Sequence, residues 1–159
     1  MVLYPFLLAD NSLGYEYKNS ISNGCFFNIA ARLAKYTGNS TYIDWAERTY
    51  DWMSYIGLID DRYYVYDGTA VLINCSNVNH LQWSYNAGVL LFGAASLWNI
   101  TGSDIWYQRT QGLLNGTEVF FTNESIMFEV ACEQAGTCDT VGYLFLIFSS
   151  FVIELYLIS

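Results

Sequence analysis

Two short clusters of amide, hydroxyl and aromatic side chains contain the residues of this sequence that are best suited to binding. The first cluster, residues 17–24, reads YKNSISNG, and the second, residues 82–88, reads QWSYNAG. Amides and hydroxyls each donate and accept hydrogen bonds, and a neighbouring aromatic face can stack on a sugar ring. This chemistry suits a neutral ligand rich in hydroxyl groups. The alternative is that Asn and Ser in these clusters cap the helices that follow.

Carboxylates are the second group of candidates. Asp60 and Asp61 form the only adjacent carboxylate pair, and glycoside hydrolysis uses two carboxylates, one of them as the acid/base. Arg62 follows at once among turn residues, which favours a solvated turn instead. Asp67 suits a sugar hydroxyl, although an Asx-turn would explain it equally well. His80 is the only histidine and has no matching nucleophile motif, so we predict no metal and no cofactor.

Each binding cluster begins one copy of an internal repeat. Residues 20–38 and 84–102 match at an offset of 64, and each copy has a polar start, an apolar stretch and a Thr-Gly end. The apolar stretches predict helices at 20–36 and 87–98 that neighbours enclose on all sides. Two-sided patterns predict outer helices at 41–56 and 103–114. Alternating inner and outer helices are typical of an α/α barrel or solenoid, with both polar starts at one end.

A long loop at 57–81 separates the two copies. Asp, Asn and Gly mark turns in it, and we expect a short extended piece at 63–66 that forms a hairpin with 71–73. Loops of this length in compact domains often carry function or glycans.

The sequence also indicates a compartment. A net charge of −9 with only six Lys and Arg argues against nucleic acid as a partner. The four cysteines suit an oxidising compartment, and Cys132 and Cys138 are near enough in sequence to close a small loop. The alternative is that the cysteines are buried free thiols. The sequence does not choose among the three possible disulfide pairings. Five N-x-S/T sites predict a glycosylated protein of the secretory pathway. These sites are Asn39, Asn74, Asn99, Asn115 and Asn123.

The last segment, residues 141–159, carries Glu154 as its only charge. Nineteen residues are just enough to cross a bilayer, although Glu154 disfavours a membrane helix. A buried helix is the second interpretation. The third, which we favour, is a translated intron, because Val-Gly can be encoded by an intron-like boundary and the aromatic and aliphatic run suits a T-rich intron that has been read through.

Three stretches of the sequence together resemble glycoside hydrolase family 76, the endo-α-1,6-mannanases, and most of all its fungal GPI-anchored cell-wall members. They are residues 15–53, 57–68 (GLIDDRYYVYDG) and 82–102. The resemblance covers about residues 14–139. It implies an all-α fold in which residues 1–140 form the C-terminal part of an (α/α)6 barrel, an α/α toroid, with two to three helical hairpins. It also implies retaining cleavage of α-1,6-mannan, with α-mannan or a GPI-glycan oligosaccharide as the partner. For the location of the protein it implies the cell surface or cell wall.

The resemblance assigns no catalytic residue here. In the family an adjacent Asp-Asp pair lies in a motif upstream of everything in this sequence, and Asp60 and Asp61 do not match it. We therefore expect the chain to be inactive alone. The alternatives are a membrane-tethered mannan-binding protein without catalysis, or a gene-model fragment with no independent role. The positions expected to line the mannan groove are Asn19, Asn23, Asp67, Trp83, Tyr85 and Asn86.

Overall fold

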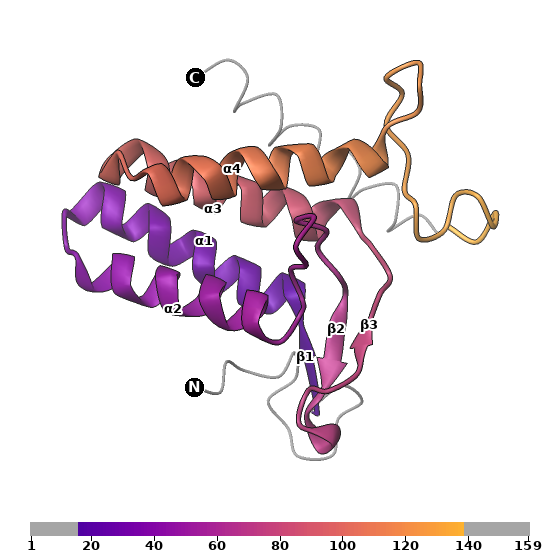
Figure 1. Cartoon of the computed structure of the whole chain (residues 1–159), viewed down its shortest axis with the longest axis horizontal. Coiled ribbons are helices and arrows are strands. Elements are labelled where there is room, and N and C mark those ends of the chain that lie inside the picture. The colour runs from indigo at the N-terminus through magenta and orange to yellow at the C-terminus, as the bar shows by residue number, and fades with distance from the viewer. Residues whose placement is uncertain (1–15, 139–159) are drawn as a thin grey trace.

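Four helices and a small three-stranded sheet make up residues 16–138, the part of the chain that the computed structural model describes (Figure 1). In chain order the elements are β1 (Tyr17–Asn19), α1 (Ser20–Thr37), α2 (Thr41–Tyr55), β2 (Gly68–Ala70), the 3₁₀ helix η1 (Val71–Ile73), β3 (Val78–Asn79), α3 (Ser84–Thr101), α4 (Asp104–Gly116) and the 3₁₀ helix η2 (Thr117–Phe120). The four predicted helices are confirmed, and α3 begins three residues earlier than predicted.

The Thr-Gly ends of the repeat terminate both inner helices in the same way. Gly38 and Gly102 have φ values of 68° and 63°, a left-handed conformation that glycine adopts without steric cost. Their N–H groups donate to the carbonyls of Ala34 and Trp98, closing the last turn. Each inner helix then turns back into an outer helix, giving two hairpins, α1–α2 and α3–α4.

The two inner helices lie side by side and run in parallel. Asn28 Nδ2 on α1 donates to the Val89 carbonyl on α3 over 2.9 Å. One turn further along, Gly93 faces Phe27 and Asn28, and a Cβ added to Gly93 would lie 2.4 Å from Phe27 Cε1 and 3.2 Å from Asn28 Cα. The glycine therefore permits an approach that no larger residue allows without displacement.

The outer helices join the same core. Trp106 of α4 is 1% exposed and packs against Phe27 of α1 and Tyr50 of α2, with ring centroids 5.8 and 5.4 Å apart. At the surface Arg109 of α4 pairs with Asp51 of α2 over 2.6 Å. One apolar cluster thus spans both hairpins.

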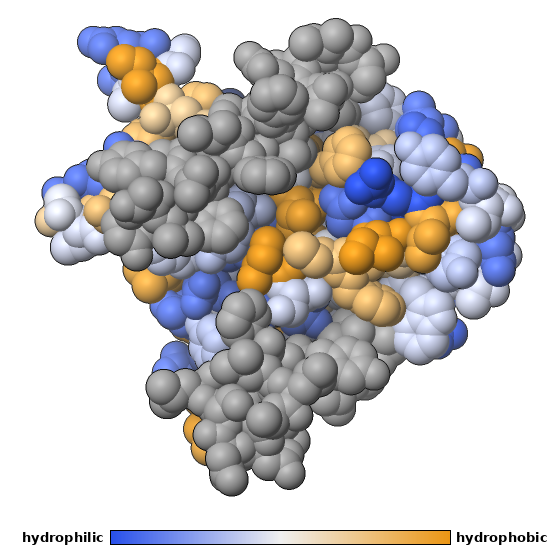
Figure 2. All heavy atoms as spheres, turned by 180° about the vertical axis from the view of Figure 1, so that it is seen from behind, coloured by the Kyte–Doolittle hydropathy of each residue, from blue (hydrophilic) through white to orange (hydrophobic). Residues whose placement is uncertain are grey.

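The prediction that both inner helices are enclosed holds for α3 and is wrong for one side of α1. Ile29 is 57% exposed and Leu33 38%, whereas Leu97, the repeat equivalent of Leu33, is fully buried. The face of α3 that carries Leu97 packs on α1. The equivalent face of α1 is left exposed, because within residues 16–138 the helices packed on α1 are α2 and α3, on its other sides. A band of apolar surface is visible on the face seen in Figure 2.

The small sheet corrects the predicted hairpin. β1 pairs antiparallel with β2, and β2 pairs antiparallel with β3, with Asn19 opposite Gly68 and Gly68 opposite Asn79. Val71–Ile73 is a 3₁₀ turn, and the strands lie at 68–70 and 78–79. The pairing of 63–66 with 71–73 is wrong because Val65 bridges back to Ile59 instead.

The structural repeat extends beyond the helices into the loop that follows each hairpin. Isolated bridges join Ile59 to Val65 and Phe121 to Met127, which are 62 positions apart in the sequence. Two backbone hydrogen bonds of 2.9 Å show the same offset. In the first loop Tyr66 N donates to the Leu58 carbonyl, and in the second Phe128 N donates to the Phe120 carbonyl. Tyr63 and Ser125, which both have positive φ values, are also 62 positions apart. Asp67 and Glu129 consequently occupy corresponding places.

The predicted domain boundary at 140 and the 141–159 segment lie outside the described residues. Within residues 16–138, none of the helices combines the length and apolarity needed to cross a membrane.

We predict that Gly93→Ala destabilises the chain. The gain in helix propensity, about 1 kcal/mol, is outweighed by overpacking against Phe27 and the α1 backbone, so the net loss in unfolding free energy should be about 1–2 kcal/mol. Urea unfolding measures it, with exposed Lys35→Ala on α1 as a control expected within about 0.5 kcal/mol of wild type. A more stable Gly93→Ala variant would contradict the close parallel contact.

Candidate functional site

The candidate residues gather where the inner helices begin. Because α1 and α3 run in parallel, their first turns lie at the same end of the molecule, next to the three-stranded sheet (Figure 1). Asn23 and Asn86 both lie in these first turns, which confirms that the two polar clusters share one end. We call this end the rim: the first turns of α1 and α3 together with residues 17–19, 66–68, 79 and 83.

A carboxylate bonded to two neighbours lies on the rim. Tyr17 Oη donates to Asp67 Oδ2 over 2.5 Å, and Asn79 Nδ2 lies 3.3 Å from the same oxygen and 3.2 Å from Tyr17 Oη. Burial and the bond to Asp67 raise the pKa of Tyr17, so the phenol stays protonated as a donor. Asn79 was missed by the sequence analysis because only the register of β2 with β3 brings it opposite Gly68.

The aromatic side chains of the second cluster form a stacked pair. The rings of Trp83 and Tyr85 lie 6.0 Å apart with planes 24° from parallel, and both side chains are half-buried. Burial raises the pKa of Tyr85 to about 12, and the nearby charges of Asp67 and Glu129 add to the effect. The Tyr85 phenol therefore lies near the carboxylates of Asp67 and Glu129.

In the first cluster, Asn19 caps a helix, whereas Asn23 keeps an unpaired oxygen. Asn19 Oδ1 accepts from the Ser22 N–H over 3.0 Å, so the helix-capping alternative accounts for Asn19. Asn23 Nδ2 donates to the Asn19 carbonyl over 2.7 Å. Asn23 Oδ1 is buried and has no hydrogen-bond partner within the described residues.

Asn86 is the polar residue that capping does not explain. Its side chain is 1% exposed, and neither its amide nitrogen nor its amide oxygen has a hydrogen-bond partner within residues 16–138. A buried polar group without a partner costs about 1–3 kcal/mol, so such groups are rare unless they serve another purpose. The donor and acceptor capacity of this amide is therefore unused within residues 16–138.

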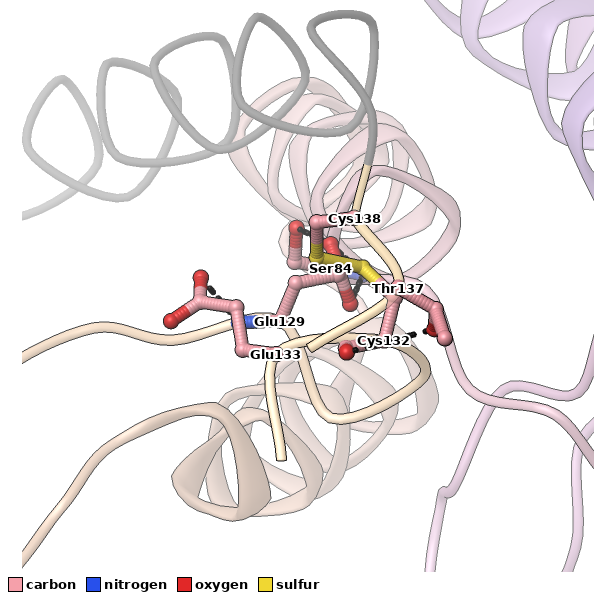
Figure 3. Close-up of a disulfide and its surroundings, with 6 residues drawn as sticks. All are labelled: Ser84, Glu129, Cys132, Glu133, Thr137 and Cys138. Atoms are coloured by element: carbon pink, nitrogen blue, oxygen red, sulfur yellow. Dashed lines mark hydrogen bonds between the residues drawn. A yellow bond between two sulfur atoms is a disulfide. The ribbon is translucent and has the colours of Figure 1, made fainter. Parts of the chain in front are cut away.

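A buried carboxylate caps α3 from a distant part of the chain. Glu129 is fully buried, and Ser84 N donates to both of its carboxylate oxygens over 3.1 and 3.2 Å, while Ser84 Oγ donates over 2.7 Å (Figure 3). Burial raises the pKa of Glu129, although the bonds from Ser84 oppose the rise. From the sequence, Glu129 and Glu133 are expected to lie beside the Cys132–Cys138 loop. The contact of Glu129 with Ser84 could not be predicted, because it follows from the fold of the 120–129 loop.

The adjacent pair Asp60 and Asp61 forms a turn, as expected. Asp60 accepts from the backbone N–H groups of Arg62 and Tyr64 over 2.9 Å and pairs with the Arg62 guanidinium over 3.3 Å. Burial raises the pKa of Asp60, but hydrogen bonds from Tyr64, Tyr66 and Arg62 outweigh it and hold the pKa below its ordinary value. Asp61 is exposed. This pair therefore stays outside the rim.

Cys132 and Cys138 form a disulfide, whereas Cys25 and Cys75 are not disulfide-bonded within the described residues. All five asparagines of the N-x-S/T sites are exposed, which leaves them accessible to glycosylation; whether they are glycosylated stays a prediction. They are Asn39, Asn74, Asn99, Asn115 and Asn123.

The paired helical hairpins, whose parallel inner helices begin at one polar rim, define part of an α/α barrel. The chain belongs to glycosyl hydrolase family 76, whose family model matches residues 8–156. The matched range runs into the 141–159 segment.

Two curated relatives show the extent of the similarity. The chain is 55% identical over 129 residues to mannan endo-1,6-alpha-mannosidase DCW1 of Candida glabrata, covering 80% of this chain and 29% of the relative. It is 52% identical over 129 residues to DCW1 of Saccharomyces cerevisiae, covering 80% and 28%. The chain thus spans less than a third of the length of these relatives.

Solved structures place the fold within the same family. The crystal structure of Dfg5 from Chaetomium thermophilum in complex with glucosamine superposes with a TM-score of 0.85 at 43% identity, covering 89% of this chain and 35% of that one. A family 76 α-mannanase from Bacteroides thetaiotaomicron superposes with a TM-score of 0.65 at 22% identity, covering 86% and 36%, and supports the fold alone. The predicted all-α, partial α/α barrel is therefore confirmed.

We predict that Glu129 makes the chain less stable as the pH rises. Its folded-state pKa is raised above the ordinary value of 4.5, so its contribution is fully present below pH 4.5 and is lost as the pH rises through the folded pKa. Urea unfolding at several pH values between 4.5 and 8 should show this decline in wild type and a flatter profile in Glu129→Gln. Equal slopes in the two proteins would mean that Glu129 titrates normally.

Proposed function

We propose that this chain forms part of the substrate groove of a mannan endo-1,6-α-mannosidase that acts on α-1,6-mannan or a GPI glycan in the fungal cell wall. The observation that carries the proposal is the buried, unpaired amide of Asn86 in the first turn of α3, immediately after the Trp83–Tyr85 stack. The names of the fungal relatives and the glucosamine bound by Dfg5 support a carbohydrate ligand.

Each part of the rim has a role in this proposal. The Trp83–Tyr85 stack receives the apolar face of a sugar ring, and the Asp67 carboxylate, held by Tyr17, accepts a hydrogen bond from a sugar hydroxyl. A further hydroxyl, which can donate and accept at once, satisfies the amide of Asn86 and adds to the specificity of binding. Asn23 offers its unpaired Oδ1 in the same way, and Asn19 acts through α1, which it caps.

Binding without turnover is the activity that we assign to the chain alone. In the whole enzyme, the resemblance implies that one Asp of an upstream pair attacks the anomeric carbon while the other protonates the leaving oxygen, and water or an acceptor sugar completes the reaction. The alternative, a membrane-tethered mannan-binding protein, also binds without turnover. Joining the chain to the upstream region of a fungal relative distinguishes these two hypotheses. The joined protein should cleave α-1,6-mannan if the chain is part of an enzyme, and should not cleave it if the chain belongs to a binding protein.

The protein that contains this chain acts, in our proposal, in the secretory pathway and at the cell surface. The five exposed N-x-S/T asparagines and the Cys132–Cys138 disulfide support an oxidising compartment where glycans are added. Membrane association through residues 141–159 belongs to the alternative.

We predict that Asn86→Ala weakens sugar binding without lowering stability. The free chain loses a buried group that has no partner, so its unfolding free energy should stay equal or rise, while the affinity for α-1,6-mannotriose should fall about tenfold through the lost hydrogen bonds. Calorimetric titration and urea unfolding measure the two effects. In a full-length parent enzyme the same change should raise KM for mannan.

Asn77→Ala serves as the matched control, because Asn77 is exposed and, among the described residues, its side chain makes no hydrogen bond. Its backbone carbonyl accepts from Thr69 and is retained in the variant. Its affinity and stability should equal those of wild type. An Asn86→Ala variant that is less stable and binds normally would remove Asn86 from the groove.

Expression of the chain in a yeast secretory pathway tests the compartment. We expect endoglycosidase treatment to lower the apparent mass, and Asn→Gln changes at the five sites to abolish that shift together. A secreted chain whose mass is unaffected by the treatment would contradict glycosylation.

A further inference from the structure

The two inner helices are capped in different ways. α1 is capped from within, since Asn19 directly precedes it and accepts from the Ser22 N–H. α3 follows Trp83, whose side chain makes no capping hydrogen bond. The cap on α3 comes instead from the Glu129 carboxylate, 45 residues further along the chain. The position of the first turn of α3 therefore depends on where Glu129 is held.

Residues 129–138, which we call the strap, hold Glu129 through local bonds (Figure 3). Glu129 N donates to Glu133 Oε1 over 2.9 Å, and the Glu129 carbonyl accepts from Cys132 N and Glu133 N over 3.2 and 3.0 Å. The Cys132–Cys138 disulfide closes the strap, and Thr137 N donates to the Cys132 carbonyl over 3.1 Å inside it. These bonds hold the backbone of Glu129 and so fix the position from which its carboxylate contacts Ser84.

The corresponding place in the first copy shows what is special about Glu129. Ser20 is equivalent to Ser84, and its N–H donates to the backbone carbonyl of Asp67 over 2.7 Å, while its hydroxyl donates to the Tyr66 carbonyl. The backbone makes the serine contact there, which leaves the Asp67 carboxylate for the rim. In the second copy the longer Glu129 side chain makes the contact itself and is fully buried.

We propose that Glu129 is a positioning residue whose carboxylate, held by the disulfide-closed strap, fixes the first turn of α3 and so sets Trp83, Tyr85 and Asn86 for sugar binding. The proposal rests on the proposed function for its ligand. It divides the two equivalent acids by role: Asp67 contacts the sugar, and Glu129 orients the residues that do. Trp83, Tyr85 and Asn86 flank or follow Ser84 within two residues, so a displacement of Ser84 moves all three.

The test uses the full chain, α-1,6-mannotriose as the probe, and amide hydrogen exchange at Ser84. In Glu129→Ala we expect a loss of exchange protection at Ser84 and about a tenfold rise in Kd, with the far-UV spectrum of a folded chain. Glu129→Gln keeps an oxygen acceptor for Ser84 and should restore affinity to within about threefold of wild type. Exposed Glu124→Ala, on the same loop, is the charge-matched control and should behave as wild type.

A second variant tests the strap itself. Replacing both Cys132 and Cys138 by Ser keeps the Glu129 side chain but opens the strap that holds it. We expect this double variant to raise the Kd and to speed amide exchange at Ser84, as Glu129→Ala does. Should that double variant fold poorly, the comparison of Glu129→Ala with Glu129→Gln still decides the role of the carboxylate.

The two proposals fail in different ways. If wild-type chain does not bind α-1,6-mannotriose yet Ser84 loses protection in Glu129→Ala, the groove is wrong and the α3 cap stands. If Ser84 exchange is unchanged in Glu129→Ala, or if that folded variant binds like wild type, the positioning role is overturned.

Discussion

The parallel contact between α1 and α3 is the constraint on which the other features depend. Gly93 lets α3 approach the α1 backbone at Asn28, and Asn28 bonds across to the Val89 carbonyl. Since both helices run in the same direction, their polar first turns come to lie at one end. A single close contact between apolar helices thus creates a polar rim with two symmetric halves.

Each half of the rim is completed by a loop that returns to the serine at the start of its inner helix. The two loops share their bridges, turn bonds and left-handed residues, so they are copies of one design. They differ in the acid that ends them. Asp67 contacts Ser20 through its backbone carbonyl, so its carboxylate lies on the rim, where it bonds to Tyr17 and Asn79. Glu129 contacts Ser84 through its carboxylate, which caps α3. In our proposal Asp67 therefore binds the sugar, and Glu129 positions the residues around Ser84.

The helices could be predicted from the sequence because their signals are local. Apolar runs, polar starts and Thr-Gly ends specify α1 and α3 directly, and the offset between them places their first turns together. The sheet could not be predicted, since its strands are two or three residues long and are defined by pairing across the chain. For the same reason the place of Asn79 on the rim and the contact of Glu129 with Ser84 were not predicted: they follow from strand register and from loop geometry. The exposed side of α1 could not be foreseen either, because an apolar stripe does not specify what packs on it.

A ¹H–¹⁵N correlation spectrum of the full chain, recorded during titration with α-1,6-mannotriose, tests the rim most directly. We expect the largest shifts at the Asn86 side-chain amide, the Trp83 indole and the backbone of residues 84–88, with little change at the open face around Ile29 and Leu33. Shifts confined to that open face, with an unmoved Asn86 amide, would contradict a sugar-binding rim at the start of the inner helices.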